Sequence, residues 1–180
     1  DLNQIKKKNY LLCVGRLEKQ KAFHYAIEGF AGIAQKFPDL RLKILGEGSL
    51  KQELEQTSKD YSIADRVDFE GFQKDIIPYY LYAKATVLTS LNEGFPNVLI
   101  ESIILGTPVV SFDCPSGPEE LIKEGINGYI VKHKNVDDLK KKLLTIMTSQ
   151  FSIDKMYLTI KKHELNEVVK YYEKLLNSFL

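Results

Sequence analysis

The sequence alternates between short apolar runs and longer stretches of helical periodicity, and this alternation limits the possible folds more than any other feature. After the first run, Phe23, Ala26, Ile27 and Phe30 recur at steps of three and four residues, which is typical of a helix that buries one face. The apolar runs cover residues 10–14, 41–45, 66–70, 85–90, 108–112 and 128–131. Alternating strands and helices imply βαβ units with right-handed crossovers. The sequence therefore predicts an α/β fold, a Rossmann-like parallel sheet of about six strands with helices on both faces.

Capping and turn residues give the expected helix boundaries. Pro38 predicts the end of the first helix, and Ser49 is the expected N-cap of a second helix that runs to about Tyr61. Pro78 fits the first turn of a short helix near residues 75–83. Further helices are expected from Asn97, from Glu119 and over residues 136–147.

Composition excludes several classes of protein. With 44% hydrophobic residues, 27% charged residues and a formal net charge of +1, the chain is typical of a globular protein that does not bind nucleic acid. It contains no signal peptide and no apolar stretch of about 18 residues, so no membrane span is expected. Cys13 and Cys114 form no disulfide framework, and we expect reduced thiols in a cytosolic protein. His24, His133 and His163 share no metal-ligand spacing.

Glycine-bearing or polar loops follow the first five predicted strands. In a parallel sheet such loops gather at the carboxyl edge, where open α/β sheets bind their ligands. The loops are Gly15-Arg16, Gly46-Glu47-Gly48, Gly71, residues 90–93 and Pro115-Ser116-Gly117. Their common position predicts a nucleotide crevice at this edge.

Two carboxylates bracket the turn before the predicted fourth helix. Glu93 and Glu101 are separated by seven residues, beginning with Gly94-Phe95-Pro96-Asn97. Glu93 is expected on a strand-to-helix loop and Glu101 about one turn inside the helix, so both acids can face one crevice. The helix N-terminus offers free backbone N–H groups and a partial positive charge, which suit hydroxyl and phosphate oxygens. A sugar nucleotide carries both kinds of oxygen.

Two cations lie five residues apart where the first strand meets its helix, Arg16 and Lys21. A departing nucleoside diphosphate gains negative charge as its glycosidic bond breaks, and fixed cations stabilise that charge more in the transition state than in the ground state. Arginine binds phosphate oxygens as a fork, whereas lysine supplies a compact point charge. A pyrophosphate site is therefore expected here, and a solvated helix start is the alternative.

The spacing of Glu93 and Glu101 resembles the Glu-(seven residues)-Glu motif of the retaining nucleotide-sugar glycosyltransferases of family 4, also called group 1, which have the GT-B fold. The stretch Gly15-Arg16-Leu17 with Lys21 resembles another pattern of that family, although Ala22 stands where the family usually has glycine. Pro115-Ser116-Gly117-Pro118 resembles the variant found in a subset of surface-polysaccharide transferases, where this loop lines the sugar end of the crevice.

The resemblance implies a role for each matching residue. Glu93, Arg16 and Lys21 are the implied catalytic set, with Glu93 at the transferred sugar and both cations on the pyrophosphate. Glu101 accepts hydrogen bonds from the ribose, the backbone after Glu93 holds sugar hydroxyls, and the loop of Gly71 holds the base. The implied donor-binding residues are Gly15, Gly46, Gly48, Gly71, Phe72, Gly94, Phe95, Asn97, Val98 and Glu101.

The resemblance also implies a domain organisation, that of one half of a GT-B enzyme. Residues 1–9 are expected to be a linker from a missing N-terminal domain, residues 10–150 a nucleotide-sugar-binding Rossmann-like domain, and residues 151–180 its C-terminal helical segment. Because the chain lacks an initiator Met, we interpret it as an excised donor-binding domain that is inactive alone. The last segment has an apolar helical face of Leu165, Val168, Val169, Tyr172, Leu175, Leu176 and Phe179.

The function implied is transfer of a hexose or N-acetylhexosamine from a nucleoside diphosphate sugar, with uridine as the expected base, to a growing bacterial surface glycan such as capsule or lipopolysaccharide, with retention of configuration. No cofactor or metal is implied, because cations and a helix N-terminus serve the phosphates and no Asp-x-Asp triplet is present. The glycan or lipid-linked acceptor would bind the N-terminal domain, and the parent protein would be cytoplasmic, peripheral at the inner face of the membrane. A non-catalytic nucleotide-sugar-binding or regulatory domain and a sugar-nucleotide epimerase of similar fold remain as alternatives.

Overall fold

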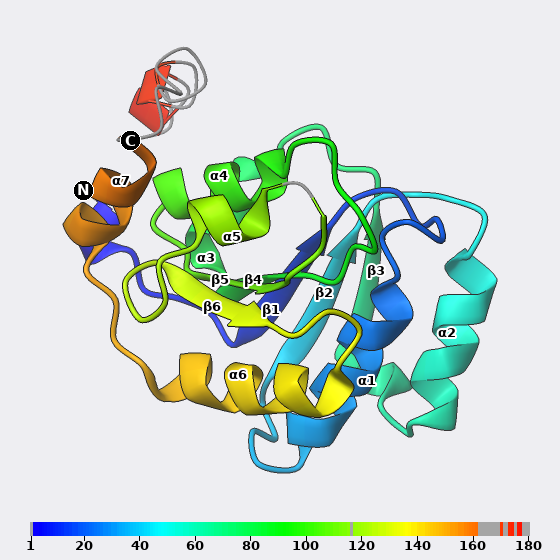
Figure 1. Cartoon of the computed structure of the whole chain (residues 1–180). Coiled ribbons are helices and arrows are strands. Elements are labelled where there is room, and N and C mark those ends of the chain that lie inside the picture. The colour runs from blue at the N-terminus through cyan, green and yellow to red at the C-terminus, as the bar shows by residue number, and fades with distance from the viewer. Residues whose placement is uncertain (1, 116, 162–169, 171–172, 175, 178–180) are drawn as a thin grey trace.

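The sheet has six parallel strands in the order β3-β2-β1-β4-β5-β6 (Figure 1). The strands are β1 (Tyr10–Val14), β2 (Arg41–Leu45), β3 (Val67–Gly71), β4 (Ala85–Leu88), β5 (Val109–Phe112) and β6 (Gly128–Val131). They come from a computed structural model that describes residues 2–115, 117–161, 170, 173–174 and 176–177. The predicted α/β class and the parallel Rossmann-like sheet are confirmed.

Helices cover both faces of the sheet, as expected (Figure 1). On one face, α1 packs against both α2 and α6, and on the other α4 packs against α3, α5 and α7. The first group is α1 (Phe23–Ala34), α2 (Lys51–Asp60) and α6 (Val136–Thr148); the second is α3 (Ile77–Tyr82), α4 (Asn97–Ile104), α5 (Pro118–Leu121) and α7 (Ile153–Lys161). Short 3₁₀ turns span Leu2–Gln4 and Ala64–Arg66.

Each face has its own hydrophobic core. The α1 side buries Ile27 and Phe30 against Leu139 and Leu143 of α6. Gly29 permits this close packing, since a Cβ there would lie 2.6 Å from a Leu139 methyl carbon. The α4 side holds two clusters, one around Leu99, Ile103, Leu121, Met156 and Ile160, the other around Leu12, Ile77, Tyr80 and Leu105. The apolar periodicity of the sequence therefore marks the buried faces.

The first helix ends at Ala34, before the predicted boundary at Pro38. Arg66 explains the difference, because its guanidinium donates hydrogen bonds to the carbonyl oxygens of Ala34 (2.9 Å), Phe37 (2.9 Å) and Leu40 (2.9 Å). These bonds hold the chain in a turn after the helix. Arg66 itself lies in a 3₁₀ turn rather than in the third strand, where the sequence placed it.

The prediction that Ser49 caps the second helix is wrong. The N-cap is Leu50, which makes no side-chain capping bond. The Ser49 backbone N–H and hydroxyl both donate to the carboxylate of Glu18, each at 2.9 Å. These two bonds lower the pKa of Glu18. They tie the loop after β2 to the loop after β1, so Ser49 joins two loops instead of starting a helix.

The C-terminal segment is only partly described. Helix α7 packs on α4, and Leu176 packs against the cluster that contains Tyr80. The other apolar positions expected on the last helix, namely Leu165, Val168, Val169, Tyr172, Leu175 and Phe179, lie outside the described residues. Within the described ranges, no helix is long and apolar enough to cross a membrane.

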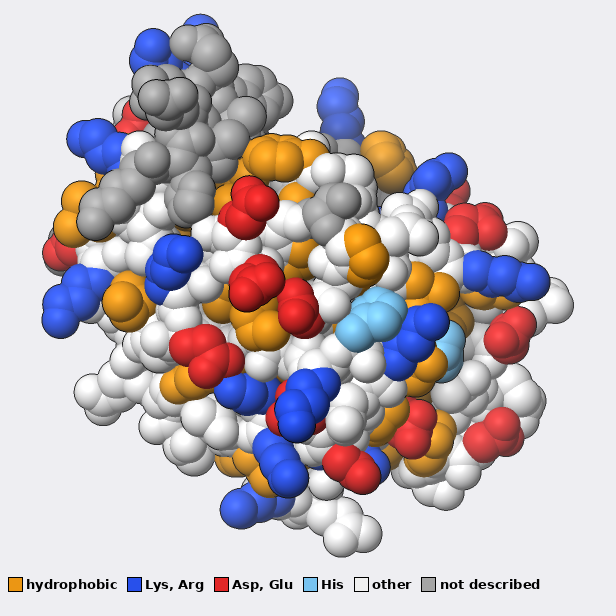
Figure 2. All heavy atoms as spheres, in the orientation of Figure 1, with side chains coloured by type: hydrophobic (Ala, Val, Ile, Leu, Met, Phe, Trp, Pro, Cys, Tyr) orange, Lys and Arg blue, Asp and Glu red, His pale blue; other side chains and the backbone are white. Residues whose placement is uncertain are grey.

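Basic and acidic side chains alternate over the face shown in Figure 2 without a large patch of one sign. This agrees with the formal net charge of +1.

Candidate functional site

The candidate site lies at the carboxyl edge of the sheet, where β1 and β4 are neighbours. Strand β1 pairs with β2 on one side and with β4 on the other, so the chain winds away from this point in both directions. Open α/β sheets bind ligands in the crevice at such a switch point. The five loops predicted to share this edge follow β1 to β5 of one parallel sheet, so they do share it.

Backbone-to-backbone contact joins the first three loops, and glycine makes that contact possible. A Cβ on Gly46, whose φ is +131°, would lie 2.0 Å from the carbonyl oxygen of Gly15. A Cβ on Gly48 would lie 2.4 Å from the carbonyl oxygen of Leu17. The Gly46 N–H also donates to the Gly71 carbonyl at 2.8 Å. The Gly46–Gly48 loop therefore holds neighbouring loops together, a role that the sequence did not indicate.

A cavity of about 480 Å³ opens between these loops. Its size lies within the range of roughly 300 to 1,000 Å³ common for small-molecule sites. Phe72, which is 72% exposed, stands at its rim. The lining residues are Val14, Gly15, Arg16, Leu45, Gly46, Glu47, Phe72, Gln73 and Ile76. Its largely apolar wall suits a flat ring such as a nucleobase.

Lys21 and Glu93 form an ion pair between the loops after β1 and β4. The Lys21 ammonium lies 2.7 Å from Glu93 Oε1, and the two side chains are only 16% and 8% exposed. The hydroxyl of Ser90, which is fully buried, donates to the same oxygen at 2.5 Å. Gly15 leaves room for the lysine, because a Cβ there would lie 2.9 Å from Lys21 Cε. The structure thus joins two residues that the resemblance had assigned to neighbouring parts of the ligand, Lys21 to the pyrophosphate and Glu93 to the sugar.

Arg16 belongs to the same loop as Lys21 but is not part of this pair. Its side chain is exposed and lines the cavity, and among the described residues it forms no ion pair. A ligand phosphate at the mouth of the cavity could therefore reach an uncommitted guanidinium. Lysine has three N–H donors, so Lys21 can also donate to a phosphate while it stays on Glu93.

The N-terminus of α4 presents backbone donors next to Glu93. Asn97 N–H donates to the Phe95 carbonyl and Leu99 N–H to the Pro96 carbonyl, both at 2.9 Å. The N–H groups of Gly94, Phe95 and Val98 have no acceptor among the described residues. Unpaired donors at a helix N-terminus favour anionic or hydroxyl oxygens. The ring of Phe95 is 48% exposed over this turn.

Glu101 lies one turn inside α4, as predicted, and is partly buried. Its Oε2 accepts a hydrogen bond from the hydroxyl of Tyr80 at 2.8 Å. Tyr80 belongs to α3 and is completely buried. A residue of the neighbouring helix α3 therefore positions the Glu101 carboxylate, a contact that the sequence did not suggest.

The loop after β5 lies against the turn that follows Glu93. Gly117, with φ +115°, lies so close to the Glu93 turn that a Cβ would be 2.8 Å from Pro96 Cδ. Glu93 N–H donates to the Pro115 carbonyl at 3.4 Å. Cys114 next to this loop is a buried free thiol, and burial followed by the charge of Glu93 raises its pKa to about 11. Its thiol is thus kept protonated at neutral pH.

The chain matches the family model of group 1 glycosyl transferases over residues 1–173. It belongs to the group 1 glycosyltransferase family. An uncharacterized glycosyltransferase of Haemophilus influenzae is 34% identical over 133 residues, which cover 74% of this chain and 38% of that protein. The lipopolysaccharide 1,6-galactosyltransferase of Salmonella typhimurium is 33% identical over 147 residues, which cover 77% of this chain and 40% of that protein. The chain spans less than half the length of these relatives.

Solved structures agree with this family membership. The apo form of the lipopolysaccharide outer core galactosyltransferase WaaB is 29% identical, with a TM-score of 0.80 over 98% of this chain and 51% of that one. The C-terminal domain of a group 1 family protein from Francisella tularensis is 26% identical, with a TM-score of 0.71 over 94% and 89%. TarM of S. aureus in complex with UDP is 25% identical, with a TM-score of 0.78 over 98% and 35%. This group 1 glycosyltransferase chain corresponds to the C-terminal half of a GT-B fold.

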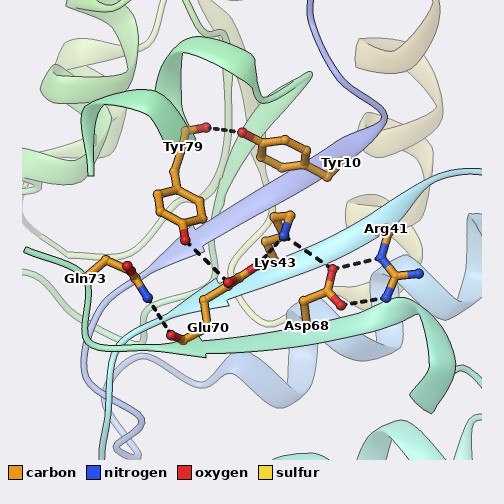
Figure 3. A network of polar contacts seen from close by, with 7 residues as sticks. All are labelled: Tyr10, Arg41, Lys43, Asp68, Glu70, Gln73 and Tyr79. Atoms are coloured by element: carbon orange, nitrogen blue, oxygen red, sulfur yellow. Dashed lines mark hydrogen bonds and ion pairs between the residues drawn. The ribbon is translucent and has the colours of Figure 1, made fainter. Parts of the chain in front are cut away.

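A larger cavity, of about 570 Å³, lies elsewhere on the domain. It is lined partly by residues at the amino ends of β1 and β2 and by tyrosines of α3, away from the carboxyl edge. Figure 3 shows the polar network beside it, where Lys43 pairs with Asp68 and Glu70, and Arg41 pairs with Asp68. Because these charges neutralise one another, we interpret the network as ion pairs that link the surface side chains of β2 and β3, and not as the substrate site.

The sequence placed Ser90 in a loop at this edge without a role for its side chain, and it did not indicate Tyr80 as a residue of the site. Ser90 stands three residues before Glu93, a spacing that could have indicated a bond to its carboxylate. Tyr80 gave no signal, because a buried aromatic residue on a short helix looks like an ordinary core residue.

Within the described ranges, no group of histidine, cysteine and acidic residues could hold a metal ion.

Proposed function

We propose that this chain is the donor-binding half of a retaining glycosyltransferase that transfers a hexose or N-acetylhexosamine from a UDP-sugar to a growing surface glycan. The observation that carries the proposal is the Lys21–Glu93 pair at the switch point, next to the free N–H groups of α4. It joins a phosphate-binding cation to the carboxylate proposed for the sugar. Family membership supports the reaction class.

The chain's own residues can stabilise a departing nucleoside diphosphate. Lys21 can keep one N–H on Glu93 and direct the others at a phosphate oxygen, while Arg16 offers its fork from the cavity wall. Both charges act where negative charge grows as the bond to the sugar breaks. With the amide groups of Gly94, Phe95 and Val98 on the sugar hydroxyls, Glu93 lies close to the reacting carbon.

Two comparisons support the choice of donor and acceptor. The TarM structure contains UDP, which favours uridine as the base in the cavity edged by Phe72. The Salmonella relative is named as a lipopolysaccharide galactosyltransferase, which favours a hexose donor and a surface glycan as acceptor. We propose that the acceptor binds to the part of the protein outside this domain, and that the parent enzyme acts in the cytoplasm, peripheral at the membrane.

A product assay tests this proposal against the two alternatives. The full-length protein is incubated with UDP-sugars and glycan acceptors, and the products are examined by NMR for anomeric configuration. A glycan product of retained configuration is expected. A UDP-sugar epimer without transfer would favour an epimerase, and binding without any turnover would favour a regulatory domain.

A further inference from the structure

Tyr80 connects α3 to α4 through its side-chain hydroxyl and through its backbone carbonyl. Its hydroxyl donates to Glu101 Oε2 at 2.8 Å, in the middle of α4. Its backbone carbonyl accepts a hydrogen bond of 2.6 Å from the hydroxyl of Thr107, which follows the end of α4. Thr107 is itself tied to α4, because its N–H donates to the Ser102 carbonyl at 2.8 Å. Tyr80 therefore braces α4 at two points.

The brace reaches the nucleotide crevice through apolar packing. Tyr80 belongs to a cluster that includes Val14 and Ile76, both of which line the 480 Å³ cavity. The same cluster includes Val98, three residues before Glu101 on α4. The ring is fully buried and cannot meet a ligand itself. Its hydroxyl donates to Glu101, so an effect of this hydroxyl on a ligand can pass through the Glu101 carboxylate.

We propose that Tyr80 is a positioning residue for donor binding: its hydroxyl fixes the Glu101 carboxylate in the rotamer that accepts hydrogen bonds from the ribose. This inference rests on the proposed function, in which Glu101 meets the ribose. A glutamate side chain has several rotamers, and the cost of ordering it on binding is avoided if it is already held. The bond from Tyr80 supplies that order before the nucleotide arrives.

The test compares UDP with 2′,3′-dideoxyuridine diphosphate, which lacks the ribose hydroxyls. Binding of both to the chain and to Tyr80→Phe is measured by calorimetry. We expect Tyr80→Phe to weaken UDP binding by about 3- to 10-fold, the cost of ordering one side chain. The dideoxy compound should bind both proteins equally. In Glu101→Gln, adding Tyr80→Phe should weaken UDP binding much less than it does in the parent.

Tyr79→Phe is the matched control. Tyr79 is the neighbouring residue on α3, and its hydroxyl donates to Glu70 at 3.3 Å in the network of Figure 3, while Tyr79 itself does not line the 480 Å³ cavity. It should leave the affinity for UDP unchanged. Equal losses for UDP and the dideoxy compound in Tyr80→Phe would mean a purely structural role and overturn the proposal, as would no loss for either. If the parent chain failed to bind UDP at all, the proposed function itself would fail instead.

Discussion

Lys21 and Arg16 come from the same loop, yet they stand in different electrostatic surroundings. Lys21 lies in a nearly buried pair with Glu93, whereas Arg16 is exposed beside the cavity. Removing one partner of a buried pair leaves the other charge without compensation. The two cations should therefore differ in what they contribute to stability, even though both are proposed to bind the pyrophosphate.

Lys21→Met should lower the free energy of unfolding by roughly 3 kcal/mol, because Glu93 stays buried without its cation. Arg16→Ala should change it by no more than about 0.5 kcal/mol. Both should weaken UDP binding by about 10- to 150-fold and leave uridine binding almost unchanged. Urea unfolding and calorimetry measure these quantities. Equal stability losses in the two variants would contradict the distinction.

The two glutamates should affect different kinetic constants in the full-length enzyme. Glu93→Gln should lower kcat more than it raises KM, because its proposed contact with the sugar can strengthen as the bond to phosphate breaks. Glu101→Gln should mainly reduce affinity for UDP, since its proposed contact with the ribose is the same in the ground state and the transition state. Steady-state kinetics and UDP titration distinguish them. Loss of UDP binding in Glu93→Gln, with binding intact in Glu101→Gln, would reverse the assignment.

Lys7 should make stability depend on pH. Its ammonium donates to the Leu81 carbonyl (2.9 Å) and to Thr107 (2.6 Å), but burial, and then the nearby charge of Lys84, lower its pKa from 10.5 to about 8. Between these pH values the unfolded chain holds the proton and the folded chain does not. The unfolded state therefore binds more protons, and the free energy of unfolding rises with pH in this window.

Comparison of the parent with Lys7→Met isolates the part of the pH dependence of the free energy of unfolding that Lys7 causes. Between pH 7.5 and 9.5 the free energy of unfolding of the parent should rise relative to this variant by about 2 kcal/mol. Lys6→Met, at an exposed lysine, is the control and should keep the pH dependence of the parent. Parallel pH profiles for the parent and Lys7→Met would show that Lys7 titrates normally.

At the scale of elements, the site depends on loops that contact each other through glycine backbone. Gly46→Ala would place a methyl group 2.0 Å from the Gly15 carbonyl oxygen at a φ of +131°. We expect it to destabilise the domain by more than about 2 kcal/mol. Gly94→Ala is the matched control, because an added Cβ there meets no described atom within 4 Å apart from those of Gly94 and its two chain neighbours. Thermal unfolding of both variants tests this, and equal melting temperatures would refute it.

The sequence predicted the strands and the common edge of the loops because both follow from periodicity and chain order. The end of α1 could not be predicted, since it depends on the guanidinium of Arg66, 32 residues from Ala34. Ser49 misled for the same reason, because its partner Glu18 lies 31 residues away. Local patterns thus predict elements well but do not contain the side-chain contacts between them.

At the scale of the whole molecule, the chain matches only part of its relatives, 38% of the Haemophilus protein and 40% of the Salmonella protein. We expect the 180-residue chain to bind UDP but to transfer no sugar, because the acceptor site is proposed to lie elsewhere. A labelled donor and glycan acceptors, with the full-length protein as positive control, measure transfer. Turnover by the chain alone would refute the two-domain interpretation.

The pairing of Lys21 with Glu93 joins positions 72 residues apart in the sequence. During synthesis, a chain that has emerged only as far as β3 contains Arg16 and Lys21 but lacks the carboxylate, Ser90 and the α4 donors. This partial chain contains only the cationic part of the site and should have little affinity for nucleotide. A nucleotide sugar that contacts both groups of residues binds only the complete fold, and its binding therefore stabilises the complete fold relative to partly folded chains. The nucleotide sugar would then assist the folding of the domain that is proposed to bind it.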